Sequence, residues 1–319
     1  MVKKHSYPMW KVSNVYAKNR PHGTAVPAGW KFEDIKGDLI KSGELIPAKE
    51  AQRRAAMLVN PAFDAPFTTD TIYAGYQLIL PGEIASAHRH VAFAMRWGIE
   101  GDETYTSVAG HKMSLAAGDL ILTPSWEWHY HGNDGTKPGI WLDSLDIPAA
   151  NYAKLNFSQP YHTPRVPDAD SPESPFKFPW AGTKAILDRT NDAHVTHHFK
   201  YKDLSGVSRT LGAQAERVKA GTSTVIKCDT FSYVYSPRLG SGHSTITPQR
   251  PGNEKNEATV IHWGPKDVFV VPAWSEVVHT ADAGEDAYLF AFNDRPQMQS
   301  LGFNRVMLED GSFGMTEWA

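Results

Sequence analysis

The sequence predicts a mainly β protein of the sandwich or barrel type, built from two copies of one unit. Three observations lead to this prediction: short strand-like stretches recur along the chain, helical patterns are few, and the second half repeats the spacing of the first. Gly (25) and Pro (22) separate these stretches, and aromatic residues make up 11% of the chain. Such a composition is typical of strands joined by tight turns.

The expected strands follow one another between turn signals, and each is rich in aromatic and β-branched residues. They lie at 72–80, 81–90, 92–101, 118–124, 139–148, 231–237, 258–264, 267–274 and 287–296. Helical patterns are short and occur at about 48–58 and 183–187. A Pro- and Gly-rich stretch at about 236–256 is predicted to be an extra loop of the second copy.

The duplication rests on four identities at fixed spacing. Residues 118–131 share Asp, Pro, Trp and a closing His with residues 266–279, namely Asp119, Pro124, Trp126, His131 and Asp267, Pro272, Trp274, His279. Residues 160–180 are rich in Pro, Asp and Ser, lack periodicity, and are predicted to connect the copies. We therefore expect an N-terminal helical segment plus the first unit at 1–159, and the connector plus the second unit at 160–319.

Charge and cysteine content exclude several classes of protein. The chain has 32 basic and 35 acidic residues, so nothing in its charge favours nucleic acid or an anionic membrane as a partner. With one cysteine, Cys228, it cannot form an internal disulfide. The N-terminus lacks the apolar stretch of a signal peptide, and no run of about 18 apolar residues occurs. The expectation is a cytoplasmic protein.

The first copy carries a pattern typical of a metal site. His88 and His90 are separated by one residue, so on a strand both imidazoles lie on the same face. Two such rings can chelate one ion, and His129, expected at the end of the strand 118–124, would supply the third ligand. A single histidine is more often structural, but this combination of three predicts a metal centre.

At these residues the sequence resembles the cupin superfamily, and more closely its two-domain gentisate and salicylate 1,2-dioxygenases. The shared stretches are PGE-x-A-x-AHRH, IEG, GD-x-ILTP-x-W-x-WH-x-HGN and WLD-x-LDIP, and the resemblance covers about 51–302. It implies two tandem cupin barrels with a few short helices, an Fe(II) ion and a homotetramer. Imidazole ligands suit iron and zinc alike, so iron rests on the resemblance.

The carboxylate ligand of the general cupin pattern is missing, because Ala94 or Met95 stands in its place. Three neutral ligands leave the full +2 charge on the metal, which favours a bidentate anion such as the carboxylate and phenolate of an ortho-hydroxybenzoate. About three positions of an octahedral ion stay open, two for the substrate and one for O2.

The second copy lacks these ligands. Alignment on Gly221 places Lys227 and Asp229 at the positions of His88 and His90, and Val277 at the third ligand. We expect this unit to be metal-free and structural, with Lys227 and Asp229 pairing inside the former pocket, although another ligand there is not excluded.

Two residues near the triad are catalytic candidates by resemblance. His131 corresponds to a histidine that takes part in proton transfer, and its ordinary pKa near neutrality suits that role. A structural role is the alternative, since the metal-free copy has His279 at the same place. Asp143 would orient His131 through a hydrogen bond, and the metal-free copy has Ala291 there.

Four further residues are candidates for substrate binding. Arg96 shares strand parity with the histidines and would hold a carboxylate, although six residues span about 20 Å on a straight strand. Arg53 matches one of an arginine pair in the family, and a surface ion pair is its alternative. Tyr73 replaces a tryptophan of the family, and Ala92 replaces a polar residue of the family on the expected ligand side.

Together these features predict an Fe(II)-dependent dioxygenase that cleaves a salicylate-type ring between the carboxyl- and hydroxyl-bearing carbons. A pocket with fewer polar groups disfavours a second ring hydroxyl, which points to salicylate or a 5-substituted salicylate. The alternatives are a gentisate 1,2-dioxygenase, another metal-dependent cupin enzyme, and a non-catalytic metal-binding cupin.

Overall fold

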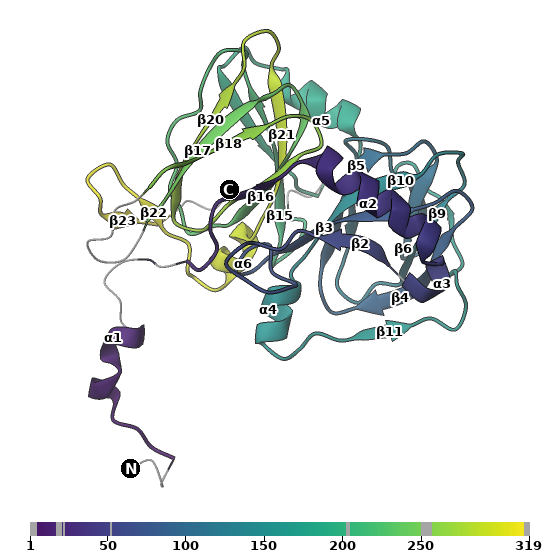
Figure 1. Cartoon of the computed structure of the whole chain (residues 1–319), viewed down its shortest axis with the longest axis horizontal. Coiled ribbons are helices and arrows are strands. Elements are labelled where there is room, and N and C mark those ends of the chain that lie inside the picture. Colours follow the sequence, from purple (N-terminus) through teal and green to yellow (C-terminus); the bar gives the residue numbers. More distant parts are fainter. Residues whose placement is uncertain are drawn as a thin grey trace.

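Two β barrels lie side by side and form the body of the molecule, as the computed structural model in Figure 1 shows. This arrangement confirms the predicted mainly β fold. The short elements η2 (Met9–Lys11) and α1 (Ser13–Tyr16) lie away from both barrels. The structure describes residues 5–16, 21, 23–51, 53–201, 205–249 and 257–315.

The first barrel consists of two six-stranded sheets. One has the order β13 (Lys177–Phe178), β8 (Leu120–Thr123), β5 (Ala94–Glu100), β10 (Gly139–Leu145), β3 (Tyr73–Ile79), β2 (Arg54–Met57). The other has the order β11 (Ser158–Pro160), β4 (Ile84–His90), β9 (His129–Asn133), β6 (Thr104–Val108), β7 (His111–Ser114), β12 (Ala169–Asp170).

The second barrel pairs a six-stranded sheet with a three-stranded one. The larger sheet has the order β1 (Ala28–Trp30), β19 (Val268–Val271), β16 (Tyr233–Leu239), β21 (Ala287–Asn293), β15 (Gly212–Val218), β14 (His194–His198). The smaller has the order β18 (Thr259–Trp263), β17 (Gly242–Pro248), β20 (Ser275–Ala281), and β22 (Val306–Met307) and β23 (Phe313–Gly314) form a separate hairpin.

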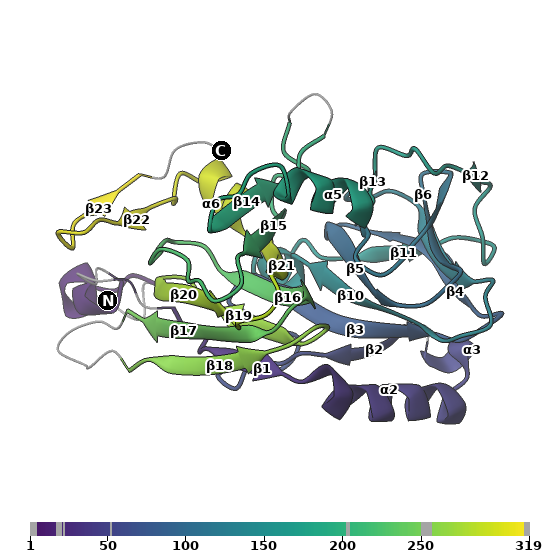
Figure 2. The ribbon, with the colours of Figure 1, turned by 90° about the horizontal axis from the view of Figure 1, so that it is seen from above.

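The helices are few, as predicted, but the longest one was not foreseen. Helix α2 (Phe32–Leu45) buries Phe32 and Leu39 and lies across β2 and β3 (Figure 2). Its polar residues obscure this narrow apolar stripe in the sequence. The other helices are α3 (Ala48–Ala51), α4 (Ile147–Tyr152), α5 (Trp180–Leu187) and α6 (Arg295–Ser300).

Two sequence-based assignments were wrong in part. The helix expected at 48–58 ends at Ala51, and Arg54–Met57 is a strand that pairs with β3, because the sheet edge supplies partners for its backbone. The loop expected at 236–256 consists largely of β16 and β17, which pair with neighbours through their whole described length. Residues 250–256 lie outside the described part.

The predicted duplication is confirmed in the backbone. Trp126 and Trp274 both have a positive φ, 68° and 60°. The Trp126 amide donates to the carbonyl of His90 at 2.8 Å, and the Trp274 amide donates to that of Asp229 at 2.7 Å. These bonds place Asp229 at the position of His90, as the alignment required.

The two barrels pack back to back through the sheet that contains β5 in the first and the six-stranded sheet that contains β21 in the second. Trp97 of β5 stacks on Phe290 of β21, with ring centroids 3.9 Å apart and planes 7° apart. Side chains of both sheets join one hydrophobic cluster. Because side chains alternate along a strand, Arg96 and Asp143 point the other way, into the first barrel.

Segments outside the barrels are exchanged between them. The connector strands β11, β12 and β13 add to sheets of the first barrel, whereas the N-terminal strand β1 pairs with β19 of the second. Each of these segments completes the sheet edge that it reaches.

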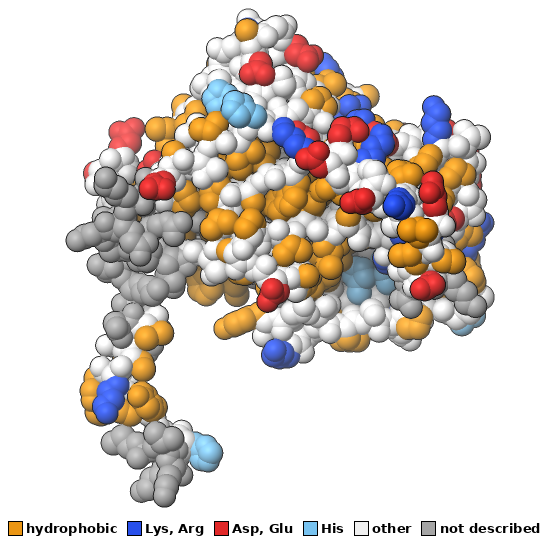
Figure 3. All heavy atoms as spheres, viewed as in Figure 1, with side chains coloured by type: hydrophobic (Ala, Val, Ile, Leu, Met, Phe, Trp, Pro, Cys, Tyr) orange, Lys and Arg blue, Asp and Glu red, His pale blue; other side chains and the backbone are white. Residues whose placement is uncertain are grey.

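The visible surface mixes acidic and basic side chains over both barrels (Figure 3). This agrees with a formal net charge of −3. None of the described helices is long and apolar enough to cross a membrane.

Candidate active site

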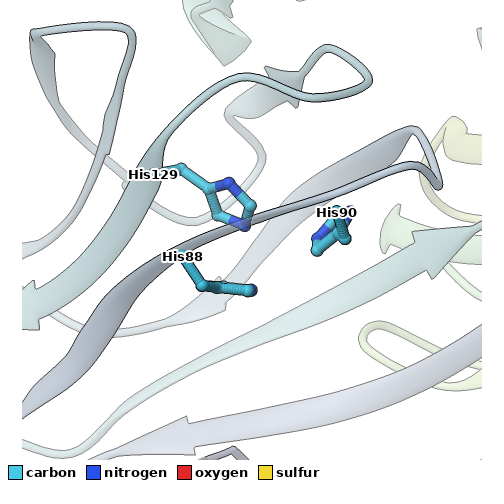
Figure 4. Close-up of side chains that lie close together, drawn as sticks. All are labelled: His88, His90 and His129. Atoms are coloured by element: carbon cyan, nitrogen blue, oxygen red, sulfur yellow. The ribbon is translucent and has the colours of Figure 1, made fainter. Parts of the chain in front are cut away.

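Three histidines of the first barrel converge on one point (Figure 4). His88 and His90 come from β4 and His129 from β9, and His88 lies directly opposite His129 in the strand pairing. One ligand nitrogen from each residue lies within 4.8 Å of the others. In the described part of the chain, no other such group of His, Cys, Asp or Glu residues occurs.

The position of His129 differs from the expectation in one respect. It does not end the strand 120–123 but begins the next strand, after a turn that contains Trp126. The turn reverses the chain and brings the imidazole back to β4. The sequence spacing was informative, but the strand assignment was wrong.

Backbone carbonyls orient two of the three rings. Nδ1 of His90 lies 2.7 Å from the carbonyl oxygen of Ala92, and Nδ1 of His129 lies 2.9 Å from that of Glu127. A carbonyl only accepts hydrogen bonds, so Nδ1 carries the hydrogen and Nε2 keeps a free lone pair. Nε2 of His129 is buried without a hydrogen-bond partner among the described residues. Such a nitrogen suits a metal ion.

The imidazoles are neutral, as metal ligands must be. Burial lowers the pKa of His88 to about 2, and Arg53 adds to the effect. Burial lowers the pKa of His90 to about 4 and that of His129 well below its ordinary value. An ion about 2 Å from each nitrogen requires the nitrogens to lie no more than about 4 Å apart, so the rings would move closer than the 4.8 Å within which they now lie. The donor set therefore fits one divalent ion.

Arg96 reaches the site from β5, not along the strand of the histidines. Residues 91 and 92 form a bend, so strand parity does not carry from His90 to Ala92 or Arg96. The bend returns the chain, which removes the difficulty of the 20 Å span. Arg96 is buried, and its charge lowers the pKa of His88, His90 and His129.

Asp143 pairs with Arg96, not with His131. Nε of Arg96 lies 3.2 Å from Oδ1 of Asp143, and Nη1 of Arg96 donates to Thr123. The two residues are directly opposite on β5 and β10. The expectation that Asp143 orients His131 is corrected, because the nearer cation attracts the carboxylate. Burial raises the pKa of Asp143, and Arg96 opposes this rise.

His131 is held by a residue that the sequence analysis did not identify. Its Nδ1 lies 3.0 Å from Oγ1 of Thr106, and its Nε2 is buried without a partner among the described residues. Burial and the charge of Arg96 lower its pKa well below the ordinary value. The signal was present in the repeat: His279 contacts Ser244 in the same way, Nδ1 to Oγ at 2.7 Å.

The two adjacent arginines have different partners. Nη2 of Arg53 lies 2.9 Å from Nε2 of His88, so this guanidinium reaches the triad. Arg54 makes two 2.6 Å hydrogen bonds to the carboxylate of Glu83. Arg53 is thus the arginine placed at the site, and burial lowers its pKa to about 10.

Tyr73 and Ala92 are both buried close to these groups. Burial and the charge of Asp143 raise the pKa of the Tyr73 hydroxyl, which keeps it protonated. Gly75 leaves room for it, since a Cβ at Gly75 would lie 2.8 Å from the hydroxyl oxygen. Ala92 contributes its carbonyl to His90. Before any ion binds, the site holds two guanidinium groups and one carboxylate, so it attracts anions.

The corresponding positions of the second barrel form an ion pair, as expected. Nζ of Lys227 lies 3.2 Å from Oδ2 of Asp229, and the hydroxyl of Tyr233 bonds to both side chains. Tyr235 and Ala291 are directly opposite each other, where the first barrel has Arg96 and Asp143.

Comparisons with known proteins agree with this geometry. Residues 75–145 match the family model for the cupin domain. The chain is 33% identical to gentisate 1,2-dioxygenase 1 of Aquipseudomonas alcaligenes, covering 93% of this chain and 91% of the relative. It is 30% identical to a 5-aminosalicylate 1,2-dioxygenase of Comamonas sp., covering 96% of this chain and 87% of the relative.

A solved structure is similar over nearly the whole chain. It is the salicylate 1,2-dioxygenase of Pseudoaminobacter salicylatoxidans, determined as an adduct with gentisate. The TM-score is 0.86 at 27% identity, and the match covers 97% of this chain and 92% of the other.

Proposed function

This chain belongs to the cupin family of gentisate and salicylate 1,2-dioxygenases, and we propose that it works with one Fe(II) ion held by His88, His90 and His129. Its similarity to these relatives assigns it to the aromatic ring-cleaving dioxygenases of the salicylate type. The observation that carries the metal-site proposal is the convergence of three neutral imidazoles beside two guanidinium groups, and the choice of iron rests on the family.

The ion, when bound, would supply coordination of the substrate's carboxylate and hydroxyl and the one-electron chemistry that lets O2 react. Three neutral ligands leave its charge uncompensated, which favours a bidentate dianion. The protein contributes orientation, exclusion of water and a proton acceptor.

The two arginines are proposed to bind the substrate carboxylate. Arg53 reaches His88, and Arg96 lies buried between Asp143 and Thr123. A guanidinium fixed by two neighbours offers its remaining N–H groups in one direction, which orients a planar carboxylate. Asp143 therefore acts as a positioning residue for Arg96.

His131 is proposed to accept the phenolic proton. The proposal rests on the tautomer in which Nδ1 donates to the hydroxyl of Thr106, which leaves the lone pair on Nε2, and this nitrogen is buried without a partner among the described residues. A neutral imidazole with a free lone pair accepts a proton when a hydroxyl is placed against it.

We propose that Tyr73 and the segment at Ala92 contact the substituents of the substrate ring and determine which of them are accepted. Tyr73 and Ala92 are both buried, and Ala92 offers no side-chain donor. Such buried surroundings accept salicylate or a 5-substituted salicylate more readily than a second ring hydroxyl. The homotetramer, the cytoplasmic location and the division at residue 159 stay predictions.

The test is reconstitution of the metal-free protein with Fe(II) under anaerobic conditions, followed by O2 uptake with salicylate, 5-substituted salicylates, gentisate and 1-hydroxy-2-naphthoate. We expect one O2 consumed per ring opened and a loss of uptake in His129→Ala. The matched control is His279→Ala, which removes a histidine of the second barrel and should keep the activity. No uptake with any acid would contradict the proposal, and preference for gentisate would assign the alternative.

A further inference from the structure

The second barrel contains a polar cavity at the position of the active site of the first. It has a volume of about 140 Å³, and its lining includes Lys227, Tyr235, Val277 and His279. These four occupy the places of His88, Arg96, His129 and His131. The cavity is therefore the counterpart of the active-site pocket, with the ligands of the metal replaced.

A second, open cavity adjoins it. Its volume is about 340 Å³, and it shares the side chains of His198 and Arg295 with the inner cavity. The buried side chains of Phe199 and Val207, with Pro296, give it an apolar wall. Arg295 is the first residue of helix α6, and it lines both the open cavity and the inner one.

The carboxylates of the inner cavity are already satisfied. Glu216 accepts hydrogen bonds from His194 at 2.7 Å, Gln214 at 2.6 Å and Tyr235 at 2.9 Å. Asp229 accepts bonds from the Phe231 amide at 3.0 Å and the Tyr233 hydroxyl at 2.8 Å, and pairs with Lys227 at 3.2 Å. Neither carboxylate needs another cation.

Arg295, which lines both cavities, lacks such a full set of hydrogen-bond and ion-pair partners among the described residues. Arg295 forms no ion pair with any acidic residue in the described ranges, and its Nε is buried without a hydrogen-bond partner there. Its contact with the Tyr233 hydroxyl is long, 3.5 Å, and its guanidinium lies 4.8 Å from the centre of the Phe231 ring. Arg295 is half-buried, and a guanidinium without an acidic partner in such a place attracts an anion.

We propose that the second barrel binds a small aromatic carboxylate, with the carboxylate on Arg295 and the ring against Phe199 and Val207. The choice of an aromatic acid rests on the proposed function, because the substrate and the ring-opened dicarboxylate are the organic anions that this enzyme meets. The carboxylate replaces the missing partner of Arg295 with a bidentate hydrogen-bonded pair. His198 is neutral, since burial and the charge of Arg295 lower its pKa to about 4, and it can donate a hydrogen bond to the same anion.

The binding test uses the full chain with His88→Ala and His90→Ala, so that chelation at the first barrel is removed. Calorimetric titration with salicylate should give one site per chain. Adding Arg295→Gln should weaken binding at least about tenfold, the loss of one charge-assisted contact. Arg295→Lys, which keeps the charge, should retain most of the affinity.

The matched control is Arg305→Gln, which makes the same change outside both cavities, where Arg305 bonds to the carbonyls of Gly302 and Asn304. It should change the affinity less than about twofold. Unchanged thermal midpoints in all variants would show that folding is intact. A second titration with the ring-opened product in place of salicylate distinguishes substrate from product. The compound with the lower Kd is assigned as the ligand.

Three results would overturn the inference: no binding by the double variant at millimolar salicylate, equal affinity in Arg295→Gln, or full displacement by equimolar inorganic phosphate. O2 uptake by the iron-loaded wild type is measured in parallel. O2 uptake without salicylate binding at the second barrel would contradict this inference alone. Salicylate binding without O2 uptake would contradict the proposed reaction alone.

Discussion

Single hydrogen bonds to Nδ1 atoms determine which imidazole nitrogens face the metal position. His90 and His129 depend on backbone carbonyls, which no side-chain substitution removes. His131 depends on the hydroxyl of Thr106. The orientation of His131 is therefore the one that a single substitution can test, and the second barrel supplies a control in Ser244 and His279.

We expect Thr106→Val to lower kcat by about tenfold or more, because His131 loses its orienting partner. The change is nearly isosteric, so metal content should stay at one ion per chain. Ser244→Val removes the equivalent bond in the second barrel and should leave kcat unchanged. Steady-state kinetics on both iron-loaded variants checks this, and equal effects in the two barrels would contradict the role of His131.

The buried imidazoles also make the metal-free protein sensitive to acid. In the folded chain the pKa of His90 is about 4 and that of His88 about 2, against 6.5 for an ordinary histidine. Below pH 6.5 these two imidazoles bind protons in the unfolded chain but stay neutral in the folded chain until the pH is lower. Since the unfolded state then binds more protons, the free energy of unfolding falls as pH falls.

We predict that urea denaturation of the metal-free protein shows this loss between pH 6.5 and pH 4. Each of the two imidazoles contributes at most about 1.4 kcal/mol per pH unit. The variant with His88→Asn and His90→Asn should lose stability less steeply over the same range. Parallel curves for the two proteins would show that these rings are not shielded from protons.

At the scale of elements, two aspartates of the repeat anchor segments that cross between barrels. Asp119 accepts the Trp180 amide at 3.0 Å and pairs with the buried Lys177 at 3.0 Å, which ties the connector to β8. Asp267 accepts the Phe32 amide at 3.0 Å and pairs with the more exposed Lys31 at 2.8 Å. The same position thus anchors a different segment in each copy.

We expect Asp119→Ala to lower the free energy of unfolding by about 3–5 kcal/mol, because it leaves the ammonium of Lys177 buried and unpaired. Asp267→Ala should cost less, about 1–2 kcal/mol, since water solvates Lys31. Denaturant titration measures both. Limited proteolysis should cut the connector near residues 160–180 in the first variant, and a reversed order of stabilities would refute the assignment.

The whole molecule behaves as one body because its barrels share a core. Trp97 and Phe290 stack across the contact, and Phe290 also packs on Phe199 and Phe292. A hydrophobic contact of this kind opposes independent motion of two domains. The two units, although related by duplication, are not expected to unfold separately.

Calorimetry should show a single transition in the wild type, with equal calorimetric and van't Hoff enthalpies. Phe290→Ala should lower the free energy of unfolding by about 3–5 kcal/mol through the cavity at the contact. Phe303→Ala, at an exposed position, should have little effect. Two separate wild-type transitions would mean that the barrels fold independently.

The sequence by itself determined the mainly β class with part of its strands, the duplication and the triad. Each depends on local information: alternation and turn residues for the strands, fixed spacing for the repeat, and an HxH pair with a third histidine for the metal ligands. His88, His90 and Asp229 lie where spacing alone had placed them.

Only the tertiary structure decided how side chains from separate strands meet. The resemblance places Asp143 near His131. Strand pairing sets Asp143 opposite Arg96, and the two side chains form an ion pair. Contacts between distant segments also determine the partner of His131, which is Thr106. They determine the bend that follows His90 and the surroundings of Arg295 in the same way. Hydrogen bonds and ion pairs act over a few ångströms in space, and distance along the chain does not predict that separation.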